Sequence, residues 1–393
     1  MRHSLLSKFQ GTILGAVLGN VIGLQYQRQL VGIPAQTEDL LPILQLTKYQ
    51  QLTLSRATLA LNSPSKIPID EHSSGCGRLA VAWIQSLIRC NGLDLNDWRN
   101  TWEAFAKSEI YHPQRTEFQS LLNPCESAVA ALPIAMFFHE NKAKLREKII
   151  LATEVWQKQN GQEYETGVLA VGFAIARSLK QRLDPATAIE QTIAYVKTDN
   201  ALTELLLQVQ ILLEQGADLE TATTHLCKSA TALREKQGEG DKKSQTKSIV
   251  NPENFLPIAL AFYFFLNTPE DLRLSVVRAA RCGIAGQLTC ALTGAFSGAY
   301  NGASAIPVEW RQLSSAVELA PLVEGQEPLV WGTGSELKLV ELANNLFAVW
   351  AGVYNPSASL DSAALARSVA APYVIRPLEI LPGRQARGFF TLH

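Results

Sequence analysis

The stretch that decides the fold runs from Arg281 to Trp310 and reads RCGIAGQLTCALTGAFSGAYNGASAIPVEW. It contains Gly294, Gly298 and Gly302, spaced four residues apart with small residues between them. In an α-helix this spacing places the three glycines on one face, where the backbone of a second helix can approach closely. The stretch therefore predicts a buried helix that packs tightly against a partner helix.

A second glycine ladder lies near the N-terminus, in the run FQGTILGAVLGNVIG that begins at Phe9. Glycine in a helix interior costs about 1 kcal/mol relative to alanine, so two such ladders carry a substantial local penalty. Close tertiary packing can offset this penalty. We therefore expect the two ladders to mark buried helices that cross. The glycines of the second ladder are Gly11, Gly15, Gly19 and Gly23.

Most of the remaining chain has the apolar periodicity of amphipathic helices, for example in 79–90, 167–179 and 201–213. Patterns typical of β-hairpins are nearly absent. The predicted fold class is all-α, a compact multi-helix bundle. Four pairs of a capping residue and a proline predict helix starts: Asn123-Pro124, Asp184-Pro185, Asn251-Pro252 and Thr268-Pro269.

Composition limits the possible functions. The chain has 393 residues, is 47% hydrophobic and carries a net charge of −1, which disfavours a non-specific nucleic-acid binder. Six scattered cysteines without a Cys-x-x-Cys pair favour reduced thiols in a cytoplasmic protein. The apolar run 12–24 is shorter than the roughly 20 residues of a membrane span, so no membrane association is expected.

The domain organisation predicted from composition has two parts. Residues 1–313 form the main helical domain, with a mobile loop over 234–250 because that segment is polar and poor in apolar residues. Residues 314–393 form a C-terminal extension with helix-like runs at 337–351 and 360–371. The extension is expected to pack on the main domain, because its apolar face would be insoluble alone.

The glycine ladders resemble two motifs of the ADP-ribosylglycohydrolase family, of the dinitrogenase reductase-activating glycohydrolase type. The family begins with glycines four residues apart followed by Asp. It later carries Gly-Gly-Asp-x-Asp-Thr at the start of an Ala/Gly-rich helix that ends near Pro-x-x-Trp. Here the ladders, the Ala305-Ile306-Pro307 turn and Trp310 match that pattern. The resemblance implies the all-α fold of these hydrolases.

A third family motif, Thr-Asp-Asp-Thr, resembles Ser74-Gly75-Cys76-Gly77, followed by a helix-like run. A second possible placement, over 49–61, contains no acidic residue either. In both placements the pair of aspartates is missing. The late Asp-x-Asp falls on Ala285 and Gln287, and the early glutamate on Gln27.

The resemblance implies two Mg²⁺ ions, held between the early Asp pair and the late Asp-x-Asp, with ADP-ribose bound against them. Magnesium prefers carboxylates and water, yet each corresponding position here is neutral. We therefore expect no metal ligands, no catalytic residues and no cofactor. The residues expected to line a vestigial, ligand-binding cleft are Asn20, Gln27, Cys76 and Gln287.

The resulting hypothesis is a catalytically inactive family member that binds an ADP-ribose-like small molecule or a protein. One alternative is an active enzyme with metal-independent chemistry, in which Cys76, with His72 four residues earlier, or Asp70 takes part. Another is that Asp70 and Glu71 replace the missing aspartates. A third is an assembly factor whose tail covers the old cleft, with Arg376, Arg384 and Arg387 placed to dock on an acidic partner.

Overall fold

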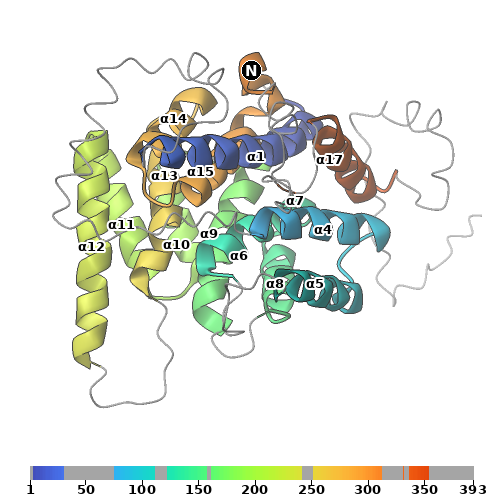
Figure 1. The fold of residues 1–393 in the computed structure, drawn as a ribbon, viewed down its shortest axis with the longest axis horizontal. Coiled ribbons are helices and arrows are strands. Elements are labelled where there is room, and N and C mark those ends of the chain that lie inside the picture. The colour runs from blue at the N-terminus through green and yellow to red at the C-terminus, as the bar shows by residue number, and fades with distance from the viewer. Residues whose placement is uncertain are drawn as a thin grey trace, which may run out of the picture.

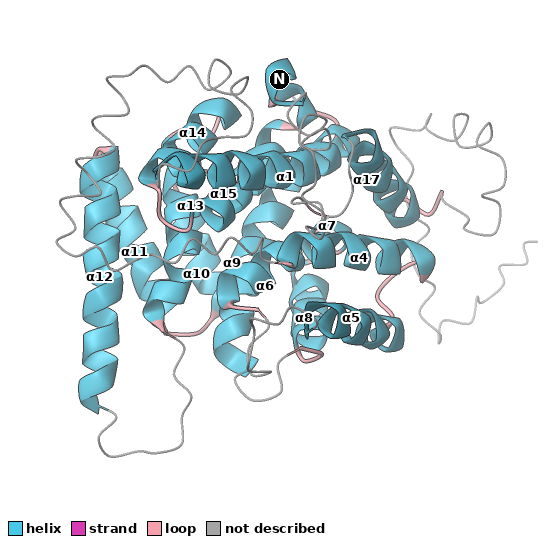
Figure 2. Cartoon of the chain, in the orientation of Figure 1, coloured by secondary structure: helices cyan, strands magenta, loops and turns pink. Residues whose placement is uncertain are grey.

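The fold consists of helices alone throughout the residues that the structure describes (Figures 1 and 2). These residues, in a computed structural model, are 3–30, 75–110, 122–156, 161–240, 251–311, 331 and 336–353. The predicted all-α class is confirmed. The α-helices are α1 (Leu5–Leu30), α4 (Cys76–Arg89), α5 (Leu95–Ile110), α6 (Pro124–Ala130), α7 (Leu132–Phe137), α8 (Lys142–Thr153), α9 (Gly161–Leu179), α10 (Ala188–Val196), α11 (Ala201–Glu214), α12 (Leu219–Gly240), α13 (Leu256–Asn267), α14 (Leu272–Cys282), α15 (Gly286–Asn301) and α17 (Glu336–Trp350), with short 3-10 helices η3 (Pro252–Phe255) and η4 (Ala303–Ala305).

The two glycine ladders meet along the antiparallel pair α1 and α15, which lie side by side in Figure 1. A Cβ atom added to Gly15 would lie less than 3.0 Å from the backbone of Gly294, and one added to Gly19 equally close to Cys290. Gly11 faces Gly298 and Gly23 faces Gly286 in the same way. The glycines therefore let one backbone lie directly on the other, as the ladders predict.

Helix α13 shows how the rest of the core surrounds this pair. Its side chains from Leu256 to Leu266 are all buried, which is typical of a helix enclosed on every side. The rings of Phe262 and Phe265 pack against Phe296 of α15, with centroids 4.7 and 5.7 Å apart. The aromatic run is therefore core.

Two of the four predicted helix starts are confirmed. The Asn123 side chain accepts a hydrogen bond from the Glu126 N–H, and the Glu126 carboxylate accepts one from the Asn123 N–H, which completes a capping box. Asn251 caps η3 by accepting a hydrogen bond from the backbone N–H of Glu253.

The other two starts are three residues too early. The Asp184 carboxylate accepts a hydrogen bond from the Ala186 N–H and forms a turn, so α10 begins only at Ala188. The Thr268 hydroxyl donates to the Phe264 carbonyl and so serves the end of α13. Asp271 caps α14 instead, by accepting a hydrogen bond from the Leu274 N–H.

The prediction of a mobile loop over 234–250 is wrong for its first seven residues. Helix α12 continues through Gly240, because the Arg-Glu-Lys-Gln run that follows Leu233 consists of strong helix formers. Arg234 also forms an ion pair of 2.9 Å with Glu253, just before α13. Residues 241–250 lie outside the described part of the chain.

Helix α17 confirms the expected helix near 337–351 and packs against α1. The Gln10 amide donates to Asn344 Oδ1 at 2.8 Å, and the Phe9 ring contacts Phe347 edge-on. The expected helix over 360–371 lies outside the described residues, and so does the boundary near 313, which remains a prediction.

The apolar run near the N-terminus is longer than expected. Leu5–Gln27 has the length and composition of a membrane span, the one such case among the described residues. The expectation that it is too short is therefore wrong. In this fold most of the run is buried against other helices, α15 above all, and the absence of membrane association stays a prediction.

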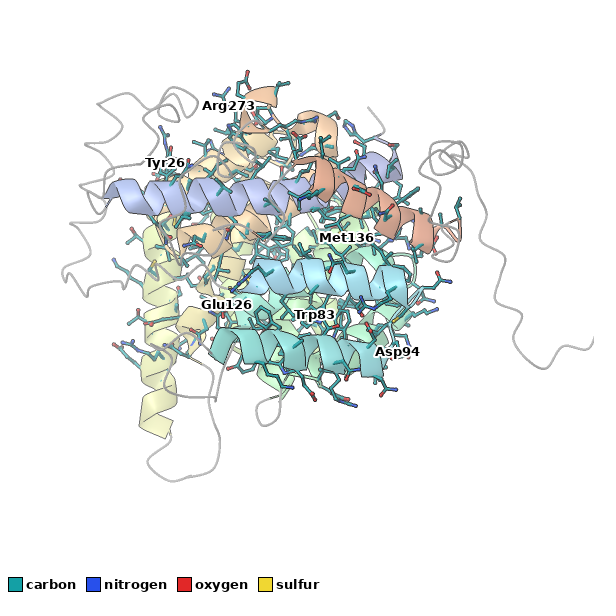
Figure 3. All side chains as sticks on the ribbon, turned by 45° about the vertical axis from the view of Figure 1, so that its right-hand side comes forward. Tyr26, Trp83, Asp94, Glu126, Met136 and Arg273 are labelled. Atoms are coloured by element: carbon teal, nitrogen blue, oxygen red, sulfur yellow. The ribbon has the colours of Figure 1, made fainter. Side chains whose placement is uncertain are left out.

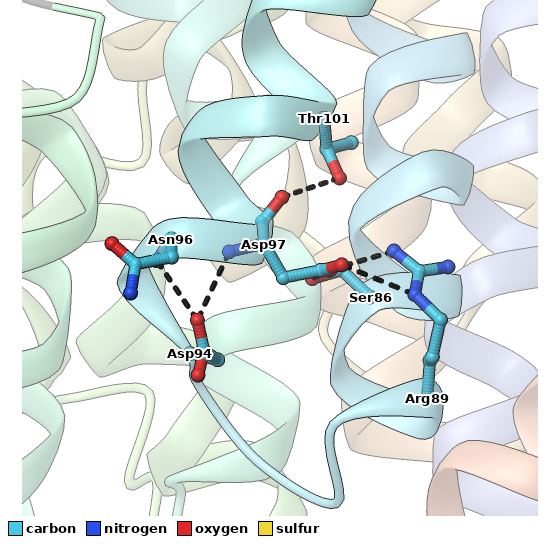
Figure 4. A network of polar contacts seen from close by, with 6 residues as sticks. All are labelled: Ser86, Arg89, Asp94, Asn96, Asp97 and Thr101. Carbon is cyan, nitrogen blue, oxygen red and sulfur yellow. Dashed lines mark hydrogen bonds and ion pairs between the residues drawn. The ribbon is translucent and has the colours of Figure 1, made fainter.

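A polar network fixes the turn between α4 and α5 (Figure 4). Arg89 pairs with the Asp97 carboxylate at 2.6 Å, and the buried Ser86 hydroxyl donates to the same carboxylate at 2.5 Å. Asp94 caps α5 by accepting hydrogen bonds from the N–H groups of Asn96 and Asp97. The network orients α4, whose first turn carries Cys76.

Lys8 of α1 is a buried cation that sequence patterns did not reveal. Its side chain is 2% exposed, and its Nζ donates to the Ser178 carbonyl at 2.7 Å, at the end of α9 where helix carbonyls lack intrahelical partners. The Tyr300 ring lies 5.9 Å from this nitrogen. Burial lowers the pKa of Lys8 to about 8.

The glycine contact predicts a large effect of Gly15→Ala. The new methyl group would meet the Gly294 backbone, which cannot move without separating α1 from α15, so we expect a loss of about 3 kcal/mol or more in the free energy of unfolding. Urea denaturation measures it. The control is Gly172→Ala in α9, where the methyl meets mainly the movable end of Ile149. Equal stability of the two variants would contradict the backbone contact.

The lowered pKa of Lys8 predicts a pH-dependent stability. Between pH 8 and 10.5 the unfolded chain binds more protons at this lysine than the folded chain, so stability rises with pH. From pH 7.5 to 9.5 the wild type should gain about 2 kcal/mol relative to Lys8→Met, because one pKa unit corresponds to about 1.4 kcal/mol. Urea denaturation at both pH values measures this difference, and parallel pH profiles would contradict it.

Candidate functional site

Two of the residues expected in the cleft, Asn20 and Gln27, lie on α1, and the structure places them differently. Asn20 is buried, with 5% of its surface exposed, whereas Gln27 is half-buried near the end of the helix. A Cβ atom on Gly286 would lie 3.2 Å from Cγ and 3.3 Å from Cδ of Gln27. The Gln27 side chain therefore rests against the first residue of α15.

Gln287 lies at the same place, because Gly23 of α1 packs directly on the backbone of Gly286 and Gln287. The crossing of the two glycine ladders thus brings Gln27 and Gln287 to one end of the helix pair. The Gln287 side chain is half-buried. This end of the α1–α15 pair is called the helix-pair end below.

The start of α15 has no side-chain cap. Ala285, in the N-cap position, has a left-handed conformation with φ 42° and ψ 48°, and its methyl group accepts no hydrogen bond. The first turn contains no acidic residue. The Thr289 hydroxyl donates a hydrogen bond of 2.8 Å to the Ile284 carbonyl and so holds the preceding loop in place. The first N–H groups of α15 therefore lack the anionic side chain that usually balances them.

Arg281 and Tyr26 belong to the helix-pair end and were missed by sequence reasoning. Tyr26 is 2% exposed, and its buried hydroxyl has the Arg281 side chain as its polar neighbour. Burial raises the pKa of Tyr26 to about 12, against the effect of the neighbouring Arg281 guanidinium, which lowers it. Their proximity depends on the helix crossing, which no local pattern encodes.

The three helices that contribute residues to the helix-pair end carry no acidic side chains. The sequences of α1, α14 and α15 contain no Asp or Glu at all. The resemblance to the family predicts carboxylates at the start of α15, whereas this helix carries no charged residue. The basic residues of the three helices are Lys8, Arg28, Arg273, Arg278 and Arg281.

Cys76 occupies a different environment at the start of α4. Its side chain is 1% exposed and lies near the thiol of Cys125 in α6, a helix that contacts both α4 and α15. Burial raises the pKa of Cys125 well above its usual value. Cys76 is therefore part of the core. Its candidate partner His72, and the acids Asp70 and Glu71, lie outside the described residues.

The indole of Trp331 covers the first turn of α4. Its ring lies so close to Gly77 that a Cβ atom there would approach within 3.0 Å, and Trp331 is 4% exposed. Trp331 has a left-handed backbone with φ 46°. The place next to the expected Asp pair is thus filled by a side chain from the C-terminal part.

The residues at the expected magnesium positions do not fit that ion. Gly75 and Ala285 offer no side-chain oxygen, Cys76 offers a soft, buried thiol, and Gln287 a neutral amide. Within the described ranges, no group of three or more His, Cys, Asp or Glu side chains is arranged to hold a metal.

Comparison with known proteins identifies the class. The sequence matches the ADP-ribosylglycohydrolase family model over residues 1–350. The chain therefore belongs to the ADP-ribosylglycohydrolase family, and the match includes α17, beyond the part that resembles the family motifs.

A solved structure described as an ADP-ribosylglycohydrolase-related protein complex is similar to this chain at 15% identity, with a TM-score of 0.47. The alignment covers 87% of this chain and 99% of that one. No curated protein matches the sequence.

The Trp331 contact predicts the reactivity of Cys76. Removing the ring in Trp331→Ala should uncover the first turn of α4 and speed alkylation of Cys76, read by mass spectrometry of the labelled peptides. Cys290 is fully buried in α15 and reports global unfolding, so its rate should rise much less. The matched control is Leu337→Ala, because Leu337 is 81% exposed. Equal acceleration at Cys76 and Cys290 would contradict a local cover.

Proposed function

We propose that this protein is a binding member of the ADP-ribosylglycohydrolase family that does not hydrolyse ADP-ribosyl bonds through bound magnesium. The observation that carries the proposal is that the residues at the expected metal positions are neutral, both at the start of α4 and at the start of α15. A family member that uses two Mg²⁺ ions would need several carboxylates there. Arg281, in the last turn of α14, is a cation next to Tyr26 of α1.

The electrostatic environment of the helix-pair end favours an anionic ligand over a metal cation. A Mg²⁺ ion near the helix-pair end would meet the guanidinium of Arg281 and the partial positive charge of the α15 N-terminus. An ADP-ribose-like molecule carries negative charge on its phosphates, so the same groups would attract it. This argument supports a small-molecule ligand over a protein partner.

The structure offers less support for a cysteine-based enzyme. A catalytic thiol must form the thiolate and reach its substrate, and both become harder when the thiol is buried among apolar groups. Cys76 is 1% exposed and lies next to the Trp331-covered turn. The alternative chemistry would therefore require this turn to open.

Calorimetric titration of the full chain with ADP-ribose, in Mg²⁺ and in EDTA, tests the proposal. We expect binding of the same affinity under both conditions, because no carboxylate at the start of α15 couples the metal to the ligand. A parallel assay for release of ADP-ribose from a modified protein should show no magnesium-dependent turnover.

Two controls make the result decisive. A magnesium-dependent family hydrolase run in parallel confirms that the assay detects release. Titration with Mg²⁺ alone measures metal binding directly. Stoichiometric Mg²⁺ binding together with magnesium-dependent release of ADP-ribose would refute the proposal, since the acids would then be supplied from elsewhere in the chain, with Asp70 and Glu71 as the first candidates.

A further inference from the structure

We infer that the outer face of α11 is a docking surface for a basic amphipathic helix of a partner protein. This surface, called the α11 face below, consists of Glu204, Leu207, Ile211 and Glu214. The inference goes beyond the proposed function, because it concerns a second surface and does not depend on any ligand of the helix-pair end.

The centre of the α11 face is apolar and exposed. Leu207 and Ile211 lie one helical turn apart on the same side of α11, with 48% and 43% of their surface exposed. No other helix in the described part of the chain carries two exposed large hydrophobic residues. Core residues such as Trp83 and Met136, labelled in Figure 3, have no exposed surface. The two apolar side chains of α11 are therefore open to contact with a second protein.

The spacing of the α11 face suits a helical partner. Positions 204, 207, 211 and 214 follow one another at intervals of three, four and three residues, which is the spacing of the contact positions in a two-helix coiled coil. On its other side α11 packs against α10, α12 and α13, and it lies beside α12 at the edge of the bundle (Figure 1). A partner helix that lies along α11 would place its own apolar residues against Leu207 and Ile211.

The charge around the α11 face is negative. Residues 198–227 contain five acidic residues and no Lys or Arg. All five acidic side chains are exposed, and none of them forms an ion pair with a residue that the structure describes. Lys and Arg side chains of a partner would pair with these carboxylates, and complementary charge of this kind speeds association and selects the partner. The five residues are Asp199, Glu204, Glu214, Asp218 and Glu220.

Glu214 is an acid whose position helix stability does not explain. Glu204 and Glu220 lie in the first turns of α11 and α12, where a carboxylate is favourable. Asp218 caps α12 by accepting a hydrogen bond from the Thr221 N–H. Glu214 instead ends α11, where the partial negative charge of the helix opposes a carboxylate. A cationic partner side chain at this end would offset that repulsion.

The same charges disfavour a second copy of this chain as the partner. If α11 packed antiparallel on α11 of another copy, Leu207 would meet Ile211, but Glu204 would meet Glu214. Carboxylates that face each other across a helix pair destabilise the contact. The partner helix must therefore carry Lys or Arg on either side of its apolar residues.

Binding of a synthetic helical peptide tests the inference. The peptide has Leu at the a and d heptad positions and Lys at the others, and fluorescence anisotropy of the labelled peptide is followed as the full chain is added. We expect saturable binding that weakens as salt is added. The double variant Leu207→Ser/Ile211→Ser should bind about ten-fold more weakly or worse, because it removes both apolar anchors. Both side chains are about half exposed, so this variant should remain folded.

Two further variants separate the apolar and the charged contributions. The matched control is Leu274→Ser, since Leu274 is 39% exposed on α14, and it should keep wild-type affinity. The variant Glu204→Gln/Glu214→Gln should bind several-fold more weakly and lose part of the salt dependence. A peptide with Glu in place of Lys should not bind the wild type.

Several outcomes would overturn the inference. These are a Lys peptide that does not bind, wild-type affinity in Leu207→Ser/Ile211→Ser, an equal loss in Leu274→Ser, or equal binding of the Glu peptide. Sedimentation of the wild type tests the alternative occupant. A dimer that Leu207→Ser/Ile211→Ser separates would make the α11 face an interface between copies of this chain and would also overturn the inference. No ADP-ribose is used, so failure here and failure of the proposed function are distinguishable.

Discussion

The backbone contact between α1 and α15 is the constraint on which the structure depends. Four glycines of α1 meet α15 at positions where any Cβ atom would collide with the facing backbone. Because these contacts repeat along both helices, they fix the axial register and the relative orientation of α1 and α15, as well as the distance between their axes. The end of α1 must then lie beside the start of α15, which places Gln27 against Gly286 and Tyr26 near Arg281. The geometry of the candidate site follows from packing alone.

Much of the fold could be predicted because it follows from local sequence patterns. Glycine spacing predicted the crossing, and the Asn123 capping box and the apolar periodicity predicted helices that the structure contains. The errors arose where two local signals compete. The Asp184 and Thr268 signals serve turns or the preceding helix, and helix-forming residues extend α12 into a polar segment.

The candidate site was predictable only in part. The expectation of neutral residues at the family's acidic positions comes from comparing motifs, and the glycine ladders imply that Gln27 and Gln287 lie close together. Tyr26, Arg281 and Trp331 could not be found in this way, because their significance depends on contacts between segments far apart in sequence. Trp331 reaches Gly77 across more than half of the chain, and no spacing rule relates the two.

In this fold the residues that pack the helix pair are separate from the side chains at the start of α15. The glycines that hold α1 to α15 occupy the contact face, whereas positions 285 and 287, where the resemblance predicts the family's acids, lie on either side of Gly286 at the helix start. Substitution there alters the charge but not the backbone contact. A helix N-terminus without an acidic residue in its first turn keeps its partial positive charge unbalanced. The chemistry of the helix start can therefore vary while the packing of α1 on α15 stays the same.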